Sequence, residues 1–194
     1  PFNMVKFRSM IINADKSGVD STGANDSRIT KLGIFIRKYK IDELPNLINI
    51  ILGEMSFVGP RPNVSRETSL YTEQEKLLLA IRPGMTDLSS IVFSDEGDIL
   101  EGSLDPDLDY NQLIRPWKSR LGLFYVESST FFMDLKLIIL TLIAILSKET
   151  SLRYINKILL KNNASEDLTR ICLRLNPLVP HPPPGSNQIV KNRN

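Results

Sequence analysis

An uncharged apolar run of ten residues, Leu137–Leu146, limits the folds open to this chain. A helix needs about 20 apolar residues to cross a bilayer, so the run is too short to span one. It predicts either a helix packed into a protein core or a helix lying in a membrane interface. Residues 131–136 continue the apolar character but carry two charges, Asp134 and Lys136, and both interpretations stay open.

The chain has one cysteine and one histidine, which restricts its possible chemistry. Cys172 has no partner for a disulfide, and this favours a reducing compartment. His181 stands within Pro180–Pro184, a stiff stretch that we expect to be too solvated to hold a general base. Catalytic triads, His-ligated zinc and Cys–His nucleophile pairs are therefore not expected. Any catalysis must depend on Asp, Glu, Lys, Arg or an oxygen-bound metal.

Charge is unevenly distributed along the 194 residues, a length typical of one domain. Residues 1–40 contain 8 basic and 3 acidic side chains, residues 41–149 contain 9 and 17, and residues 150–194 contain 7 and 2. Basic ends around an acidic middle favour an anionic surface or a polyanionic ligand as partner. Because the chain starts with Pro1 and shows no signal peptide, we expect a fragment or a processed product.

Hydrophobic periodicity and turn residues predict an α+β chain, mostly helical with a small β element. The expected elements are an extended segment at 4–10 with Lys6 and Arg8 on one face, an exposed loop at 13–27, helices at 27–40, 42–53 and 67–81, an extended segment at 55–58, and a solvated acidic loop at 95–109. In the second helix, Leu44, Leu47, Ile48 and Ile51 have the spacing of one helical face. Asp42 is its expected N-cap, and Gly53 its expected end.

The composition changes after residue 150. Residues 153–161 form a short basic amphipathic stretch, and Ser165 is the expected cap of a second helix with Leu168, Ile171, Cys172 and Leu175 as its apolar stripe. From Pro177 onward, the Pro-rich polar sequence predicts a segment without fixed structure.

The adjacent carboxylates Asp42 and Glu43 are the strongest local candidates for chemistry. At a helix start, free backbone N–H groups and the helix dipole favour the ionised form of a carboxylate. An ionised carboxylate can act as a nucleophile or bind Mg²⁺ through oxygen. The alternative is a helix cap followed by an ordinary surface glutamate, since aspartate is common at N-caps.

Three arginines, Arg37, Arg61 and Arg82, are candidate phosphate-binding residues because arginine suits bidentate capture of phosphate oxygens. Arg61 lies between Pro60 and Pro62, whose rings restrict the backbone on both sides. Lys6 and Arg8 could extend the same anion site, and for each residue a surface ion pair or a solvated face is the alternative. No Walker motif, Gly-rich dinucleotide motif or EF-hand loop is present. The combination points towards phosphoryl chemistry held by side chains.

Five blocks resemble the bacterial sugar transferase family, monotopic phosphoglycosyl transferases that start glycan assembly on a polyprenyl phosphate. In chain order they are Lys6–Met10, Asp42–Leu47, Gly53–Pro62, Arg82–Thr86, and Tyr125–Glu127 followed by Asp134–Lys136 and Thr141. The resemblance covers about residues 1–147, and the Asp-Glu-Leu-Pro and Gly-Pro-Arg-Pro blocks together are highly specific. It favours an active site over a simple cap at Asp42.

The resemblance implies a two-step, Mg²⁺-dependent transfer of a sugar 1-phosphate from a UDP-sugar to polyprenyl phosphate, in bacteria usually undecaprenyl phosphate. Asp42 would form a covalent phosphosugar intermediate, and Glu43 would assist through metal binding or by orienting the acceptor. Arg61, Arg82 and Arg37 match positions that handle phosphate or nucleotide, and Lys6 and Arg8 line the same region. Such a reaction initiates exopolysaccharide, capsule, O-antigen or glycoprotein glycan assembly.

The resemblance also implies a catalytic domain at residues 1–150, and the change of composition beyond it predicts a basic amphipathic extension at 151–176 and a tail at 177–194. Residues 131–147, and the extension, would contact membrane lipids on the cytoplasmic face of the bacterial inner membrane, where basic residues bind anionic lipid. Family members carry a membrane-inserting helix before the first block, so we expect an N-terminally incomplete chain. Asp87–Ser90 departs from the Gly and later Gln that many members have there.

Two further functional classes are alternatives for this chain. A non-catalytic membrane-surface interaction protein on the same scaffold is the alternative to an enzyme, and the intact Asp42, Glu43 and Arg61 argue against it. Nucleic-acid binding through the basic ends is not expected, because these ends lack clustered aromatic residues and any known recognition module.

Overall fold

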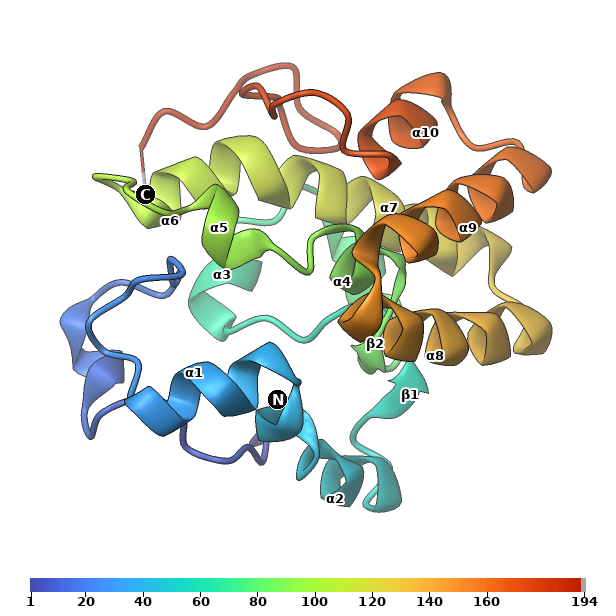
Figure 1. Ribbon diagram of the computed structural model, residues 1–194. Coiled ribbons are helices and arrows are strands. Elements are labelled where there is room, and N and C mark those ends of the chain that lie inside the picture. Colours follow the sequence, from blue (N-terminus) through green and yellow to red (C-terminus); the bar gives the residue numbers. More distant parts are fainter. Residues whose placement is uncertain (193–194) are drawn as a thin grey trace.

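The computed structural model describes residues 1–192, which form a layer of long helices above a smaller N-terminal layer (Figure 1). Its helices are α1 (Lys31–Lys38), α2 (Asn46–Ile51), α3 (Ser65–Ser69), α4 (Leu88–Val92), α5 (Glu96–Ile99), α6 (Pro106–Asp109), α7 (Arg115–Ser128), α8 (Phe131–Leu146), α9 (Lys148–Lys161) and α10 (Glu166–Cys172). The 3₁₀ turns are η1 (Ala14–Ser17), η2 (Ile41–Glu43) and η3 (Glu75–Ala80), and the π-helical turn η4 (Tyr110–Ile114) leads into α7. The prediction of a mostly helical chain with a small β element is confirmed.

Strands β1 (Ser56–Val58) and β2 (Gly84–Thr86) form a parallel pair, in which Ser56 lies opposite Gly84 and Val58 opposite Thr86. The two backbones approach closely where β1 ends. A Cβ added to Gly84 would lie 2.1 Å from the nitrogen of Gly59, so this position requires glycine. The extended segment predicted at 55–58 is therefore confirmed, and pairing brings the Gly-Pro-Arg-Pro and Arg-Pro-Gly blocks together.

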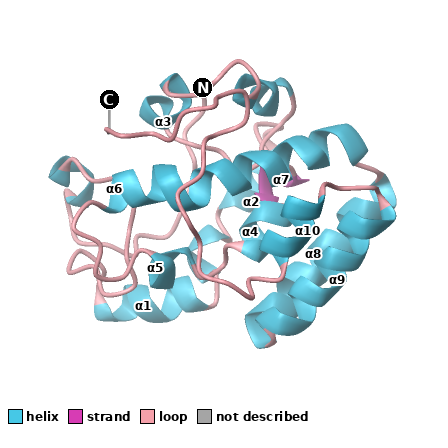
Figure 2. Cartoon of the chain, turned by 90° about the horizontal axis from the view of Figure 1, so that it is seen from above, coloured by secondary structure: helices cyan, strands magenta, loops and turns pink. Residues whose placement is uncertain are grey.

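The hydrophobic core lies where α4, α7, α8 and α9 meet, and Figure 2 shows α8 and α9 side by side. The C-terminal helices contribute Leu152, Ile155, Leu159, Leu168 and Cys172 to it, each buried. Burial raises the pKa of the Cys172 thiol to about 12, which makes it unreactive. The amphipathic stretch and the Ser165 cap, whose hydroxyl accepts from the Leu168 N–H, are confirmed. The extension thus completes the same core as the preceding residues.

Helix α8 has one side buried in the core and another side with exposed apolar side chains. Met133, Leu137 and Leu140 are buried against the core. Several other apolar side chains of α8 are exposed: Phe131, Phe132, Leu135, Ile139, Leu142 and Leu146. Within residues 1–192, no helix is both long and apolar enough to cross a membrane.

The N-terminal elements differ from the prediction. Residues 4–10 form no strand; they make a single bridge between Met10 and Ile29 and otherwise cross α2, where the Val5 N–H donates to Asn49 Oδ1 at 3.0 Å. Helix α1 starts later than predicted, after the Thr30 cap. Asp42 lies in η2 and does not cap α2, because Pro45 occupies that position.

The periodic face predicted for residues 42–53 exists, but it does not face the core. Leu44, Leu47, Ile48 and Ile51 are all exposed, Ile51 to 85%. Gly53 follows α2 with a φ of 77°, a left-handed conformation that fits its predicted role at the helix end. The periodic spacing of apolar residues indicates that they share one face of a helix. Which part of the protein that face packs against depends on the rest of the fold.

The helix predicted at 67–81 is two elements, α3 and η3, separated by a turn. The Glu75 carboxylate causes the interruption: it accepts from the Thr72 N–H at 3.0 Å and pairs with Arg115 and Ser119 of α7. Both Glu75 and Arg115 are buried. Buried ion pairs need such complete hydrogen bonding to offset their desolvation.

The acidic segment predicted as a solvated loop folds into α5 and α6. Leu100 is 1% exposed, and buried Asp107 accepts a hydrogen bond from the Ser21 N–H at 2.7 Å. Glu96 pairs with Lys118 of α7, and Asp95 pairs with Lys148 of α9. The segment is therefore structural, because cations that lie far along the chain neutralise it.

The C-terminal tail contains no helix or strand between Pro177 and residue 192, and its last two residues lie outside the described residues. It nevertheless crosses α7 with specific contacts, which differs from the expected lack of structure (Figure 2). The His181 ring stacks on Trp117 at 4.4 Å, and Thr72 Oγ1 donates to the Pro184 carbonyl at 2.5 Å. His181 therefore packs as a structural residue.

Candidate active site

Asp42 and Glu43 lie together in the short turn η2, between α1 and α2. Lys40 precedes it in a left-handed conformation, with φ 58° and ψ 20°, and its carbonyl accepts from the Glu43 N–H at 3.2 Å. The N-terminal segment covers the turn, because the Phe7 N–H donates to the Asp42 carbonyl at 3.0 Å. Each of the two acidic residues is only 8% exposed. A bend in the chain thus holds two adjacent carboxylates in a largely dry environment.

Glu43 is neutralised by two cations from other segments. Arg61 donates to both of its oxygens, at 2.5 and 3.2 Å, and Lys6 Nζ lies 3.7 Å from Oε1. Burial alone would raise the pKa of Glu43, but the charges of Arg61, Lys6 and Lys40 outweigh it and lower the pKa to about 2. Glu43 is therefore ionised at any physiological pH.

Asp42 has the opposite environment. Its Oδ1 is buried and has no hydrogen-bond partner among the described residues. Burial, followed by the neighbouring Glu43 charge, raises the pKa of Asp42, whereas Lys6 and Arg37 lower it. A desolvated carboxylate oxygen without a partner is an unusual cost for a fold to carry. Such an oxygen is available to a substrate atom or a cation.

The remaining predicted site residues divide into two groups. Arg61 reaches the dyad from the turn after β1, and the Pro60 carbonyl holds that turn by accepting from the Gly84 N–H at 3.1 Å, while Pro62 leads out of it. Arg37 belongs with the dyad through its electrostatic effect on Asp42. Arg82 and Arg8 are exposed, and within residues 1–192 neither has an ion pair with the dyad.

Four residues near the dyad were missed by sequence reasoning: Lys40, Asp87, Glu96 and Lys118. Asp87 and Glu96 act electrostatically on Arg61, and Glu96 is ion-paired with Lys118 of α7. Asp87 itself is 1% exposed and accepts from both Ser89 and Ser90. For Asp87 and Glu96, position is the signal in the sequence: Asp87 directly follows the Arg82–Thr86 block, and Glu96 is the second residue of the acidic segment.

The later blocks of the resemblance support the scaffold. Tyr125 donates its hydroxyl to Asp134 Oδ1 at 2.7 Å, which joins α7 to α8. Thr86 and Thr141 share a hydrogen bond of 2.6 Å, which joins β2 to α8. These residues fix α8 against the sheet that carries Arg61.

A metal ion would find only part of a binding site in these side chains. Within the described residues, no group of three or more His, Cys, Asp or Glu side chains could hold one. Both Glu43 oxygens bind Arg61, which leaves Asp42 Oδ1 as an unpartnered donor. Because Mg²⁺ is often held by one or two carboxylates together with substrate phosphates, the dyad fits a site that a phosphorylated substrate completes.

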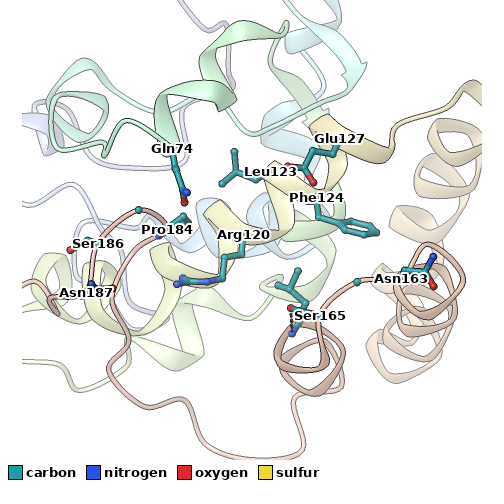
Figure 3. A pocket seen from close by; sticks show the side chains of 13 residues that line it. Gln74, Arg120, Leu123, Phe124, Glu127, Asn163, Ser165, Pro184, Ser186 and Asn187 are labelled. Atoms are coloured by element: carbon teal, nitrogen blue, oxygen red, sulfur yellow. Dashed lines mark hydrogen bonds between the residues drawn. The ribbon is translucent and has the colours of Figure 1, made fainter.

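A cavity of about 630 Å³ lies away from the dyad, between α7, the start of α10 and the tail (Figure 3). Its lining includes Gln74, Arg120, Phe124, Glu127 and Asn187. Arg120 is held there by hydrogen bonds to the carbonyls of residues 116 and 182. None of the residues predicted for the site contributes to this cavity.

Comparison with known proteins assigns most of the chain to one family. Residues 1–148 match the family described as bacterial sugar transferase. The chain belongs to the bacterial sugar transferase family. It is 35% identical over 149 residues to the uncharacterized sugar transferase EpsL of Bacillus subtilis, an alignment that covers 77% of this chain and 65% of that protein.

Two relatives have more specific names. The UDP-glucose:undecaprenyl-phosphate glucose-1-phosphate transferase of Klebsiella pneumoniae is 33% identical over 145 residues, which cover 73% of this chain and 29% of that protein. The undecaprenyl-phosphate galactose phosphotransferase of Salmonella typhimurium is 32% identical over 163 residues, with 76% and 31% covered. The chain therefore spans between about three tenths and two thirds of these relatives.

Proposed function

We propose that this chain carries the active site of a phosphotransferase that moves a sugar 1-phosphate from a UDP-sugar to polyprenyl phosphate, through a phosphosugar bound to Asp42. The observation that carries the proposal is the contrast within the dyad. Glu43 is neutralised by Arg61 and Lys6, whereas Asp42 keeps a buried oxygen without a partner. The names of the Klebsiella and Salmonella relatives support the acceptor.

In the first step, an Asp42 carboxylate oxygen attacks the sugar-bearing phosphorus of the donor. A bond forms between that oxygen and phosphorus, and the bond to the bridging oxygen breaks, so UMP leaves with both electrons. The nucleophile must be ionised, and the cations of Lys6 and Arg37 favour that form at Asp42. Phosphoryl transfer of this kind depends mainly on positioning and charge neutralisation.

In the second step, a phosphate oxygen of the lipid attacks the same phosphorus. The bond to Asp42 breaks, the carboxylate is restored, and the product is a lipid diphosphate sugar. Arg61 holds Glu43 rigidly beside the reacting carboxylate, because Pro60 and Pro62 restrict its backbone. Glu43 would therefore position the acceptor rather than react.

Mg²⁺ belongs to the same proposal. Asp42 Oδ1 would be its protein ligand, with Glu43 beside it and donor phosphates completing the coordination, and the ion would neutralise phosphate charge. Arg82 and Arg8 remain proposed phosphate-binding residues, because their exposed side chains are open to a substrate.

The lipid acceptor places the protein at a membrane, and we propose the cytoplasmic face of the bacterial inner membrane. Exposed apolar side chains on α2 and α8 support this, among them Ile48, Ile51, Phe131, Phe132 and Leu142. Exposed apolar side chains gathered on one face of a helix are a feature of interaction sites. Monotopic attachment through these faces would bring the lipid phosphate near η2, which directly precedes α2.

Intact-protein mass spectrometry tests the mechanism. Full-length protein in detergent with Mg²⁺ is offered a panel of UDP-sugars without lipid, and wild type is expected to gain one phosphosugar and release UMP. Asp42→Asn is expected to form no adduct, while its melting temperature stays the same or rises because an unpartnered buried charge is removed. Asp98→Asn, the same change at an exposed position, is the control and should react normally.

The outcomes separate the parts of the proposal. UMP release that requires polyprenyl phosphate and leaves no adduct would keep the transferase but exclude Asp42 as nucleophile. No turnover with any donor and lipid together would favour a non-catalytic membrane-surface protein.

A further inference from the structure

Lys40 is a further cation beside the dyad, two residues before Asp42. Within residues 1–192, Arg61 and Lys6 pair with Glu43, and Lys118 pairs with Glu96. No ion pair of Lys40 is found in that range, and the residue is exposed. Its carbonyl accepts from the Glu43 N–H at 3.2 Å, so the residue belongs to the turn that holds the dyad, and its ammonium interacts electrostatically with Glu43 and Asp42.

The backbone at Lys40 is unfavourable for a residue with a side chain. Its φ of 58° lies in the left-handed region, which glycine adopts without cost and which asparagine and aspartate tolerate best. The turn is held by the Lys40 N–H, which donates to the Arg37 carbonyl at 3.1 Å, and by the Glu43 N–H, which donates to the Lys40 carbonyl. Glycine would serve this turn better, and strained residues of this kind gather at functional sites.

A phosphorylated substrate at Asp42 needs a cation of this kind. Its phosphates would bring negative charge next to a buried carboxylate, and like charges repel strongly where water is scarce. Arg61 and Lys6 already neutralise Glu43, so they cannot neutralise the substrate fully. A lysine ammonium on a flexible stem, two residues before the nucleophile, can reach a phosphate oxygen.

We propose that Lys40 is a further substrate-binding residue, whose ammonium binds a phosphate group of the substrate at the dyad. The inference rests on the proposed function and adds a residue to that site. The phosphate can belong to the nucleotide donor or to the lipid acceptor, and the two sources are distinguished by separate titrations.

Isothermal titration calorimetry on the full-length protein in detergent provides the test, with UDP as one probe and undecaprenyl phosphate as the other. Lys40→Gly is expected to weaken binding of one probe about 10- to 100-fold, the effect of losing one hydrogen bond between charged groups. Lys40→Arg, which keeps the charge, should retain most of the affinity. The probe that loses affinity identifies the source of the phosphate.

Asn163→Gly is the matched control, because Asn163 has a similar φ of 56° and lies between α9 and α10, away from the dyad. Both glycine variants relieve a left-handed residue and should melt at the same or a higher temperature. Only Lys40→Gly should lose affinity, which a purely structural role would not produce.

Equal affinity of wild type and Lys40→Gly for both probes would overturn the inference and leave the proposed function intact. Wild type that binds neither UDP nor undecaprenyl phosphate would overturn both together. Loss of affinity in Asn163→Gly as well would also overturn the inference, since the effect would then follow the backbone and not the ammonium.

Discussion

Replacement of Glu43 by glutamine should remove a large pH-dependent part of the protein's stability. The pKa of Glu43 is about 2 in the folded protein against an ordinary 4.5. A lowering of this size corresponds to about 3 kcal/mol, at about 1.4 kcal/mol for each pKa unit. Since the folded pKa is the lower one, this stability is present above the unfolded pKa and is lost as pH falls towards 2. The Glu43 side chain is 10% exposed, so solvent screens the interaction little.

Urea unfolding measures this contribution directly. Trp117 is the single tryptophan of the chain and is 4% exposed, so its fluorescence reports loss of the core. Free energies of unfolding are compared between pH 7 and pH 2.5 for wild type and Glu43→Gln. The wild type should lose about 3 kcal/mol more than the variant over this range. Carboxylates far from the dyad titrate equally in both proteins, whereas Asp42 loses the neighbouring charge that raises its pKa, so the difference reports Glu43 together with its coupling to Asp42.

The control is Glu73→Gln, at a side chain that is 89% exposed and paired only with Lys76. Exposed pairs of this kind contribute little, so this variant should follow the wild-type pH dependence. Parallel curves for wild type and Glu43→Gln would refute the reasoning, because they would show that Arg61 and Lys6 do not stabilise the ionised form of Glu43.

Two further changes test the scaffold. Tyr125→Phe should lower the free energy of unfolding by about 2 kcal/mol, because a buried hydrogen bond to the Asp134 carboxylate is lost. Tyr154→Phe, at an exposed ring, should change it little. Equal urea midpoints for the two variants would contradict this expectation. Gly84→Ala should lower the free energy of unfolding by about 3 kcal/mol or more, since its Cβ would lie 2.1 Å from a backbone nitrogen. Gly18→Ala should cost about 1 kcal/mol, because the space around Gly18 is open and the φ of 74° is its one unfavourable feature. A thermal melt that ranks the two variants the other way would exclude close strand contact as the cause.

Sequence patterns correctly predicted the elements that depend on interactions between residues a few positions apart. Gly53 marks the end of α2 because it adopts a left-handed conformation, which glycine favours without help from a distant partner. Ser165 caps α10 through its own hydroxyl, three residues before the N–H it accepts from. The amphipathic pattern of residues 153–161 predicted a helix with one apolar side, and Ile155 and Leu159 of α9 are both buried. In each case the deciding interaction spans a few residues.

Signals failed where a distant partner decides the outcome. The helix expected at 67–81 is divided where Thr72 and Glu75 accept from one another's N–H groups, and Glu75 is also held by Arg115, 40 residues further along. The tail lies in place because His181 meets Trp117, and no local pattern of a Pro-rich sequence predicts that contact. Two carboxylates of the acidic segment, Glu96 and Asp95, pair with Lys118 of α7 and Lys148 of α9. Pairings of this kind depend on tertiary structure.

The dyad shows why residue type alone could not assign roles within the site. Asp42 and Glu43 are adjacent, equally buried and both acidic, yet their pKa values are displaced in opposite directions. The difference arises from Arg61, which is 18 residues away and reaches Glu43 because the parallel strands and the two prolines aim the turn after β1 at it. One guanidinium neutralises one carboxylate and leaves the other without a partner. A pair that reads as symmetrical in the sequence thus becomes one anchored group and one available oxygen, which is the division that the proposed nucleophile and its neighbour would require.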